Sequence, residues 1–491
     1  MDREKALAPL SEIGPACRFF RLFRCEAARR LRARALCPGL CPSIGPTARC
    51  FWRAGDPMNG RFPMRHHDQS PMLALTAVRP RASWGWKAAA LGLAGLLAVP
   101  SLAAARTLTV GPTGQYALPS QAAAAAVNGD TVEIQAGDYG ADTTVWKQND
   151  LVIRAVGGPV VLVGGASLTQ GKAIWLTTGN NVIISGINFS KAAVRDRNGA
   201  GIRHEGGDLR IIGCVFHDNE NGLLATSRAG ANILIESSEF YANGYGDGRS
   251  HNIYISTAAR FVMRYSASYG AKVGHQIKTR AAANEIAYNF LADGANGTAS
   301  YTIDLSNGGD SLVVGNVMQK SAKASNGTFV MYAAEGQKVA GSRLTAIHNT
   351  LVNNRSAGGF FANRDTTTPA VLSNNFMVGQ GTAVSGPAEL AGNLQLRSAG
   401  LREKATGLLK ALDGQAAAAT PGLTVTDGDP GFVNADVLDF RLTSISPAVD
   451  AGAVLPAALI PTAEYLSPLL GRARVQIGAA DVGAYEYRPA Q

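Results

Sequence analysis

The sequence predicts an all-β fold, a right-handed parallel β-helix solenoid with a short N-terminal capping helix. Three observations lead to this prediction. Short β-branched runs recur about every 25 residues from residue 151 onward, each run ends in a small or polar pair, and glycine and asparagine gather at the turns. Each run is too short to bury a core by itself, so neighbouring units must stack on one another.

The first 105 residues are expected to lie outside the folded domain. The 491-residue chain has a formal charge of +10, but residues 1–105 carry 16 of its 46 basic and 6 of its 36 acidic side chains, which leaves 30 of each in residues 106–491. Residues 72–105 have the pattern of a signal peptide: a basic leader after Met72, an apolar run over Ala88–Leu102, and small residues at Ala103–Ala105. The apolar run has 15 residues, short of the ~20 that span a bilayer.

We therefore expect a secreted or periplasmic protein that begins near Arg106 and has no membrane span in its mature form. Its neutral charge offers no broad basic field for nucleic acid. Residues 1–71 are interpreted as a non-structural extension upstream of the true start. Only Cys214 lies in the mature chain, so no internal disulfide is possible there; the other cysteines lie upstream, at Cys17, Cys25, Cys37, Cys41 and Cys50.

The repeat can be counted by choosing one landmark residue in each unit, the residue that directly follows the position at which the β-branched run ends. Successive landmarks are 27, 24, 28, 23, 27, 33 and 26 residues apart, at Ile187, Cys214, Ser238, Ser266, Asn289, Asn316, Asn349 and Asn375. A leucine-rich repeat needs a regular leucine consensus, which is absent, and a propeller blade uses about 40 to 50 residues. Variable periods near 25 favour a parallel β-helix.

Three features resemble the pectin-lyase-like superfamily. The entry segment at residues 118–140 is similar to a capping helix and first coil, with Ser120 as the expected helix N-cap. The asparagines at the landmark positions resemble an asparagine ladder, with Cys214 packed in the same column. The tail, from "GDPGFVNADVLDFRL" to "DVGAYEY", is similar to the closing region of secreted β-helix proteins. We expect the β-helix over residues 106–380, and over 381–491 a helical insertion at "LREKATGLLKALDG" and a closing β-coil region.

A second strand in each unit predicts the candidate site. If Ile253, Ile277, Ile303 and Val330 point into the core, their neighbours point outward in columns, because strand side chains alternate between faces. The central column then holds Arg203, Tyr254, Lys278, Asp304 and Met331, the next Glu205, Ser256, Arg280 and Ser306, and the preceding one Asn252, Gln276 and Thr302. Adjacent coils lie about 4.8 Å apart, which brings Tyr254, Lys278 and Asp304 into contact.

This superfamily resemblance implies carbohydrate-active enzymes, chiefly lyases, hydrolases and epimerases. Removing the proton next to a uronate carboxylate requires a cation on that carboxylate, a role that suits Arg280. Lys278 is the candidate base. Its unperturbed pKa near 10.4 must fall for this role, which Arg280 favours and Asp304 opposes. Tyr254 or His275 could protonate the leaving oxygen. Asn252, Gln276, Ser256, Ser306 and Arg203 are candidate substrate-binding residues.

Other interpretations stay open. These columns could be a solvated surface, with Lys278 and Asp304 an exposed pair of little energetic weight. A hydrolase needs two carboxylates beside the bond, and only Asp304 is central, with Glu335 and Glu205 at the margins. The acidic cluster of calcium-dependent pectate lyases is not evident, although Asp247 in a glycine-rich turn leaves Ca²⁺ possible. A non-catalytic, secreted glycan-binding or surface-associated solenoid is the competing class. In either class we expect a monomer.

Overall fold

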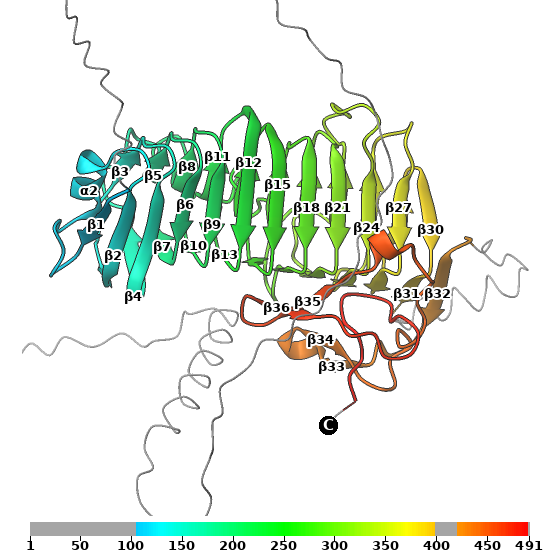
Figure 1. Ribbon diagram of the computed structural model, residues 1–491. Coiled ribbons are helices and arrows are strands. Elements are labelled where there is room, and N and C mark those ends of the chain that lie inside the picture. The colour runs from blue at the N-terminus through cyan, green and yellow to red at the C-terminus, as the bar shows by residue number, and fades with distance from the viewer. Residues whose placement is uncertain (1–104, 398–419, 490–491) are drawn as a thin grey trace, which may run out of the picture. The chain divides into compact units, whose positions relative to one another are not determined.

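The computed structural model describes residues 105–397 and 420–489, and these form a parallel β-helix (Figure 1). The predicted extension, all but the last residue of the predicted signal peptide, and the segment 401–414 lie outside the described residues. Within the two described ranges, no helix is both long and apolar enough to cross a membrane.

Three ladders of parallel strands run along the stack, and most coils add one strand to each. The first ladder contains β1 (Thr107–Val110), β2 (Thr131–Asp138), β4 (Val152–Val163), β6 (Val182–Ser185), β9 (Leu209–Ile212), β12 (Arg228–Glu236), β15 (Ala258–Arg264), β18 (Ala283–Ala287), β21 (Asp310–Val314), β24 (Leu344–Ile347), β27 (Ala370–Ser373) and β30 (Ala388–Ala391). The second contains β7 (Ile187–Ser190), β10 (Val215–His217), β13 (Glu239–Tyr241), β16 (Ala267–Tyr269), β19 (Phe290–Ala292), β22 (Val317–Lys320), β25 (Thr350–Asn353), β28 (Phe376–Val378), β31 (Asn393–Arg397) and β32 (Leu423–Asp427). Because β4 pairs with both β6 and β7, these two ladders share one sheet.

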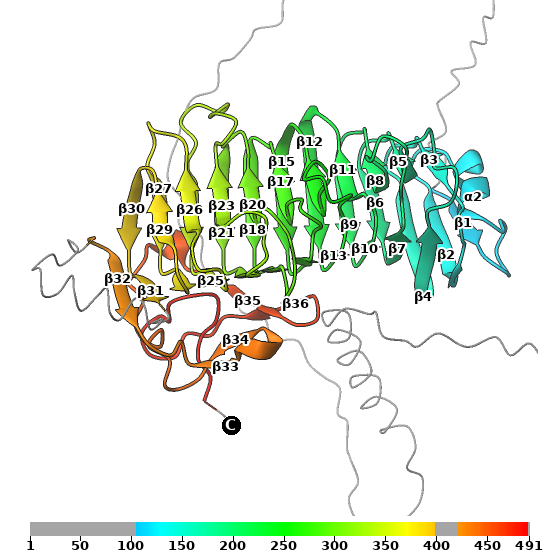
Figure 2. The same cartoon turned by 180° about the vertical axis from the view of Figure 1, so that it is seen from behind.

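The third ladder forms a separate 10-stranded sheet. It contains β3 (Thr144–Trp146), β5 (Ala173–Thr177), β8 (Ala200–His204), β11 (Asn221–Ala225), β14 (Ile253–Ile255), β17 (Ile277–Thr279), β20 (Ile303–Leu305), β23 (Thr328–Tyr332), β26 (Gly359–Asn363) and β29 (Thr382–Ser385). Its later strands follow one another along the stack in Figure 2. The candidate columns lie on this ladder.

A sharp turn joins the first ladder to the second in each coil. One residue at each turn takes a positive φ, such as Gly315 at 63°, and the landmark residue follows it. The landmark side chains hydrogen-bond from coil to coil: Asn289 N and Nδ2 donate to Asn316 Oδ1, both at 3.0 Å. The ladder continues beyond the predicted landmarks to Asn393, whose Oδ1 accepts from Asn375 Nδ2. Cys214 is buried in this column, and burial raises the pKa of its thiol to about 12.

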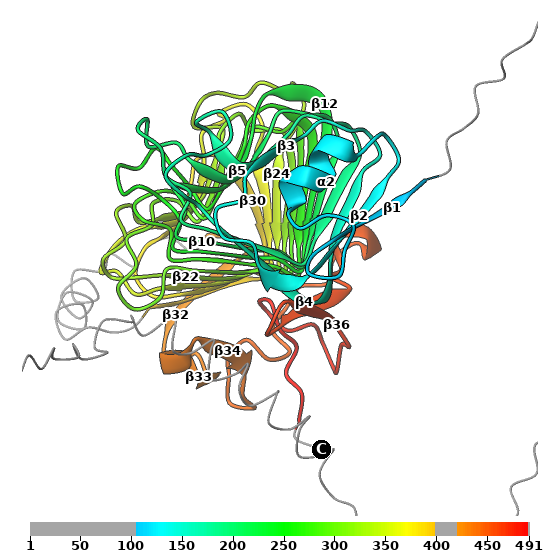
Figure 3. The ribbon, with the colours of Figure 1, turned by 90° about the vertical axis from the view of Figure 1, so that its left-hand side faces the viewer.

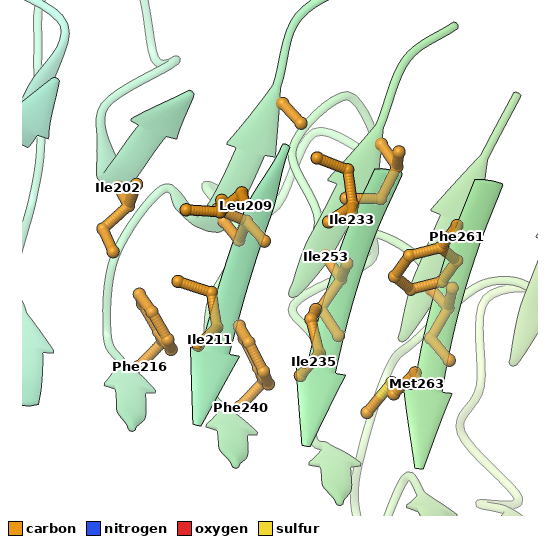
Figure 4. Packing of buried hydrophobic residues seen from close by; sticks show 14 of the residues in the cluster. Ile202, Leu209, Ile211, Phe216, Ile233, Ile235, Phe240, Ile253, Phe261 and Met263 are labelled. Atoms are coloured by element: carbon orange, nitrogen blue, oxygen red, sulfur yellow. The ribbon is translucent and has the colours of Figure 1, made fainter. Parts of the chain in front are cut away.

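The core lies between the three ladders and consists of inward side chains stacked in columns (Figure 4). Phe189, Phe216 and Phe240 stack with ring centroids 5.1 and 4.6 Å apart. The inward residues of the third ladder, Ile253, Ile277, Ile303 and Val330, are fully buried and pair with one another in register. Burial of this column directs the alternate side chains of the same strands outward.

A short helix, α2 (Pro119–Ala125), contacts β1 and β3 near the N-terminal end of the stack (Figure 3). The N-cap prediction was wrong: the helix begins at Pro119 with Leu118 as its N-cap, so Ser120 lies inside the first turn. The Gln121 side chain instead accepts hydrogen bonds from the backbone of residues 117 and 118. Proline explains the earlier start, because its fixed φ suits the first helical position.

The solenoid continues past residue 380, where the sequence analysis expected an interruption. Strands β29, β30 and β31 pair with β26, β27 and β28, and β32 pairs with β31. Four further strands, β33 (Phe432–Asn434), β34 (Asp439–Leu442), β35 (Ala463–Leu466) and β36 (Leu470–Ala473), form two antiparallel pairs, with short 3₁₀ turns at Ala435–Val437 and Ala457–Leu459. Side chains of this C-terminal segment, among them Tyr465, pack on the outer face of the second ladder.

Candidate functional site

The strand register aligns the central column as the sequence predicts. Tyr254 pairs with Lys278, and Lys278 pairs with Asp304, on β14, β17 and β20. The next position along the column is Met331, which is buried. Lys278 and Asp304 are not an exposed pair, since their side chains are only 13% and 3% exposed and Lys278 Nζ lies 3.0 Å from Asp304 Oδ2.

Glu335 lies at the centre of the site rather than at its margin. Its carboxylate accepts hydrogen bonds from Arg280 Nε and Nη2, both at 2.7 Å, and from Lys278 Nζ at 3.0 Å. Glu335 follows β23 in a loop, so strand alternation could not place it. A carboxylate held by a guanidinium on two bonds and by an ammonium on a third shows that this site can bind a carboxylate.

The charges of these groups reinforce one another. Hydrogen bonding from Arg280, more than the bond from Lys278, lowers the pKa of Glu335 to about 2 despite some burial. The same hydrogen bond raises the pKa of Arg280 above its ordinary value. Arg280 and Glu335 are therefore both charged at any pH at which the protein is expected to work.

Tyr254 lies against the other side of the Arg280 guanidinium. Arg280 Nη1 donates to Tyr254 Oη, and the guanidinium carbon lies 5.2 Å from the centroid of the tyrosine ring. Because the hydroxyl oxygen accepts this bond, its own proton points elsewhere. Tyr254 thus keeps an available proton next to the carboxylate-binding cations.

His275 lies beneath this cluster in an aromatic stack. Its ring lies between those of His251 and Tyr301, with centroids 4.6 and 5.1 Å away. Tyr301 N donates to His275 Nδ1, so the neutral ring carries its proton on Nε2, which lies 3.5 Å from Asp304 Oδ2. Burial, then the neighbouring His251, lowers the pKa of His275 well below its ordinary value. In this geometry His275 can orient the carboxylate of Asp304, and it is poorly placed to deliver a proton to a substrate on the outer face.

Two predicted substrate-binding residues are not on the outer face. Asn252 and Gln276 are fully buried, and Asn252 Nδ2 donates to Gln276 Oε1 at 2.8 Å. Their amides also donate to the backbone carbonyls of Tyr269 and Ala292. The prediction failed because β14 and β17 begin one residue later, so alternation does not extend to these positions. Thr302, in the same expected column, is buried as well.

The other predicted residues are divided between two places. Ser306 is buried and donates to Asp304 Oδ2 at 2.8 Å, so it orients that carboxylate. Ser256 and Arg203 lie toward the N-terminal end of the column and line a hollow of about 560 Å³ beside Tyr254. Arg203 Nε donates to Glu205 Oε1 at 2.6 Å.

Ca²⁺, which the sequence leaves possible, has no preformed cluster in the parts of the chain that the structure describes. Residues 105–397 and 420–489 contain no group of three or more His, Cys, Asp or Glu side chains that could hold a metal ion. Asp247 Oδ1 instead accepts from Arg249 N within its own turn. These donors do not fit a calcium site.

The fold and this outward face define the class: a parallel β-helix protein with a carboxylate-binding cation pair on one ladder. No family model matches the chain, and no curated protein does. Among solved structures the chain is similar to the pectate lyase Pel9A, with a TM-score of 0.53 and 15% identity over 78% of this chain and 96% of that one. This likeness confirms the fold.

Two structures of the PL6 family alginate lyase AlyGC, one of them of a variant, also match. Their TM-scores are 0.31 and 0.28 at 14% identity, over 71% and 73% of this chain and 58% and 59% of theirs.

Proposed function

We propose that the chain is a secreted polysaccharide lyase, or an epimerase that shares the first step, acting on a polysaccharide that contains uronic acid. The observation that carries this proposal is the carboxylate of Glu335, which Arg280 and Lys278 bind beside the Tyr254 hydroxyl. A uronate carboxylate has the same charge and planar shape. It can therefore pair with the Arg280 guanidinium once Glu335 moves aside.

Elimination begins at the carbon next to the uronate carboxylate. Arg280 pairs with that carboxylate and neutralises the charge that grows as the proton leaves. Lys278 takes the proton. When the uronate carboxylate pairs with Arg280 and displaces Glu335, Lys278 Nζ no longer donates to that loop carboxylate and can face the carbon that loses its proton.

Tyr254 completes the reaction as the acid. The carbon–hydrogen bond breaks toward Lys278, a double bond forms between the two ring carbons, and the carbon–oxygen bond to the leaving sugar breaks. Tyr254 then protonates the leaving oxygen with the proton that its bond from Arg280 leaves available. In an epimerase the same carbon would regain a proton from the opposite face, with no bond to the leaving sugar broken.

Hydrolysis fits these residues less well. A glycoside hydrolase needs a carboxylic acid whose pKa is raised so that it can protonate the leaving oxygen. Glu335 has the opposite property, because Arg280 lowers its pKa to about 2. Asp304 is only 3% exposed and is bound to Lys278, so it cannot reach a sugar ring without losing that contact.

The proposal also includes the location, the oligomeric state and the handedness of the protein. The signal-peptide pattern at residues 72–105 supports export, and we infer that the mature chain acts as a monomer outside the cytoplasm. We also infer a right-handed solenoid, because crossovers between parallel strands of one sheet are almost always right-handed, with α2 as its cap.

Substrate panels test the activity. The purified protein is incubated with polygalacturonate, alginate and glycosaminoglycans, and the near-ultraviolet absorbance of the conjugated double bond is followed. We expect Arg280→Ala to abolish product formation. Lys278→Arg keeps the positive charge next to Asp304 but cannot lose its proton, so it should abolish activity without unfolding the chain.

Matched controls come from charged residues away from the third ladder. Lys272→Arg changes an exposed lysine that pairs with Asp218, and Arg260→Ala changes an exposed arginine that pairs with Glu285. Both should keep wild-type rates. Full activity of Lys278→Arg would rule out lysine as the base, and no product on any polymer, together with no exchange of the uronate proton with solvent, would rule out the whole proposal.

A further inference from the structure

A pocket next to the cation pair lies on the same face of the third ladder, toward the N-terminal end. It has a volume of about 560 Å³, and Tyr254, which binds Arg280, is part of its wall. Most of the rest of its lining comes from β8, from β11 and the two residues after it, and from the loops at residues 191–199 before β8 and 242–252 before β14. The carboxylate site and the pocket therefore share one continuous face.

Charges of both signs line this pocket. Arg197, Arg203 and Arg249 line it, against two carboxylates, Asp196 and Asp247. Arg203 is paired with Glu205. For Arg197 and Arg249, the described part of the chain offers no carboxylate oxygen within 4.0 Å of the guanidinium, and the Arg197 guanidinium lies over the exposed Tyr245 ring at 4.4 Å.

Buried polar contacts fix the two loops that carry these arginines. The carboxylate of Glu220, which is only 7% exposed, accepts from Val194 N at 3.0 Å and from Gly199 N at 2.6 Å. Asn221 donates to Asn198 Oδ1 and accepts from His251 N, both at 3.0 Å, so one side chain binds both loops. These contacts hold the backbone of the loops that carry Arg197 and Arg249 before any ligand arrives, which reduces the loop entropy lost on binding.

We propose that this pocket binds the carboxylate of a second uronic-acid unit of the same polysaccharide chain. The inference rests on the proposed function, since it assumes that one uronate lies at Arg280. Arg203 lies on β8, three coils from Lys278 on β17, which at about 4.8 Å per coil is roughly 14 Å along the stack. The substrate would therefore run parallel to the solenoid axis, across β17, β14, β11 and β8, and would carry acidic groups on more than one sugar.

Equilibrium binding of oligouronates tests the pocket. We would measure the affinity of the full chain for a uronate disaccharide and for longer oligogalacturonates and oligoalginates, in a Lys278→Arg background so that no turnover occurs. Adding Arg197→Gln and Arg249→Gln together should weaken binding of the longer oligomers by about tenfold or more, because two charge-assisted hydrogen bonds are lost. The disaccharide, which reaches only Arg280, should bind as before.

Arg260→Gln on the first ladder is the matched control and should change neither affinity. If the double variant and its parent bind long oligomers with equal affinity, the pocket does not bind a second uronate. The same conclusion follows if the double variant loses as much affinity for the disaccharide as for the long oligomers. The two proposals fail in different ways. A length-dependent loss without any lyase or epimerase product would keep the pocket and reject the activity, whereas product formation without the loss would do the reverse.

Discussion

Glu335 holds the two candidate catalytic cations, Arg280 and Lys278, with a carboxylate that a substrate would have to replace. An ion pair as exposed as this contributes at most about 1 kcal/mol. A substrate carboxylate that no longer competes with Glu335 for the cations would therefore bind up to about fivefold more tightly. We therefore expect Glu335→Gln to lower KM for the acidic polymer by up to about fivefold. Steady-state kinetics measure this, with Glu285→Gln as the control that leaves KM unchanged; an increase in KM would contradict it.

Acid unfolding of the same variant gives a second readout. Since the folded-state pKa of Glu335, about 2, is below its ordinary value of 4.5, the folded chain binds fewer protons there than the unfolded chain. The stability that Glu335 contributes is therefore complete above pH 4.5 and is lost as pH falls toward about 2. Urea midpoints of wild type and Glu335→Gln should differ at neutral pH and converge in acid. If the difference between the two urea midpoints stays constant between pH 4.5 and about 2, Arg280 does not lower the pKa of Glu335 as described.

At the scale of the strand, alternation predicts some positions and fails at others. It placed Tyr254, Lys278 and Asp304 correctly because each lies inside a three-residue strand between two buried neighbours. It failed at Asn252 and Gln276, one residue before the strand, where buried carbonyls recruit the amides. Loop residues such as Glu335 and Arg197 belong to no column, so only three-dimensional contacts bring them to the site.

The asparagine ladder is the element that joins coil to coil, and Asn316 lies in its middle. Its side chain accepts from Asn289 and donates to Ile286 O at 2.7 Å and to Asn349 Oδ1 at 3.0 Å, all of them buried. Asn316→Ala leaves these partners unsatisfied, so the free energy of unfolding should fall by about 3 kcal/mol or more. Chemical denaturation measures the change against Asn232→Ala, an exposed asparagine on β12. Equal midpoints for the two variants would mean that the ladder does not stabilise the stack.

For the whole molecule, the distribution of charge matters more than its sum. Residues 106–491 carry equal numbers of basic and acidic side chains, which led us to expect no broad basic field for nucleic acid. Around the third ladder, five cations and five carboxylates gather on one face: Arg197, Arg203, Arg249, Lys278 and Arg280 with Asp196, Glu205, Asp247, Asp304 and Glu335. An acidic ligand would therefore be bound by individual cations that it can pair with, and not by a net positive field. Net charge could not reveal this, because the arginines come from different coils and loops.

The C-terminal segment determines which face remains open. It covers the outer side of the second ladder, where Tyr465, 3% exposed, stacks on Phe290 with centroids 5.9 Å apart. Tyr465→Ala should therefore lower the free energy of unfolding by about 3 kcal/mol, through lost burial and the cavity left behind, while the activity per folded molecule stays unchanged because the third ladder is untouched. Ile445→Ala, in the same segment but 76% exposed, is the control. If Tyr465→Ala unfolds at the same denaturant concentration as wild type, the segment does not stabilise the solenoid, and if it loses activity while folded, the two faces are coupled.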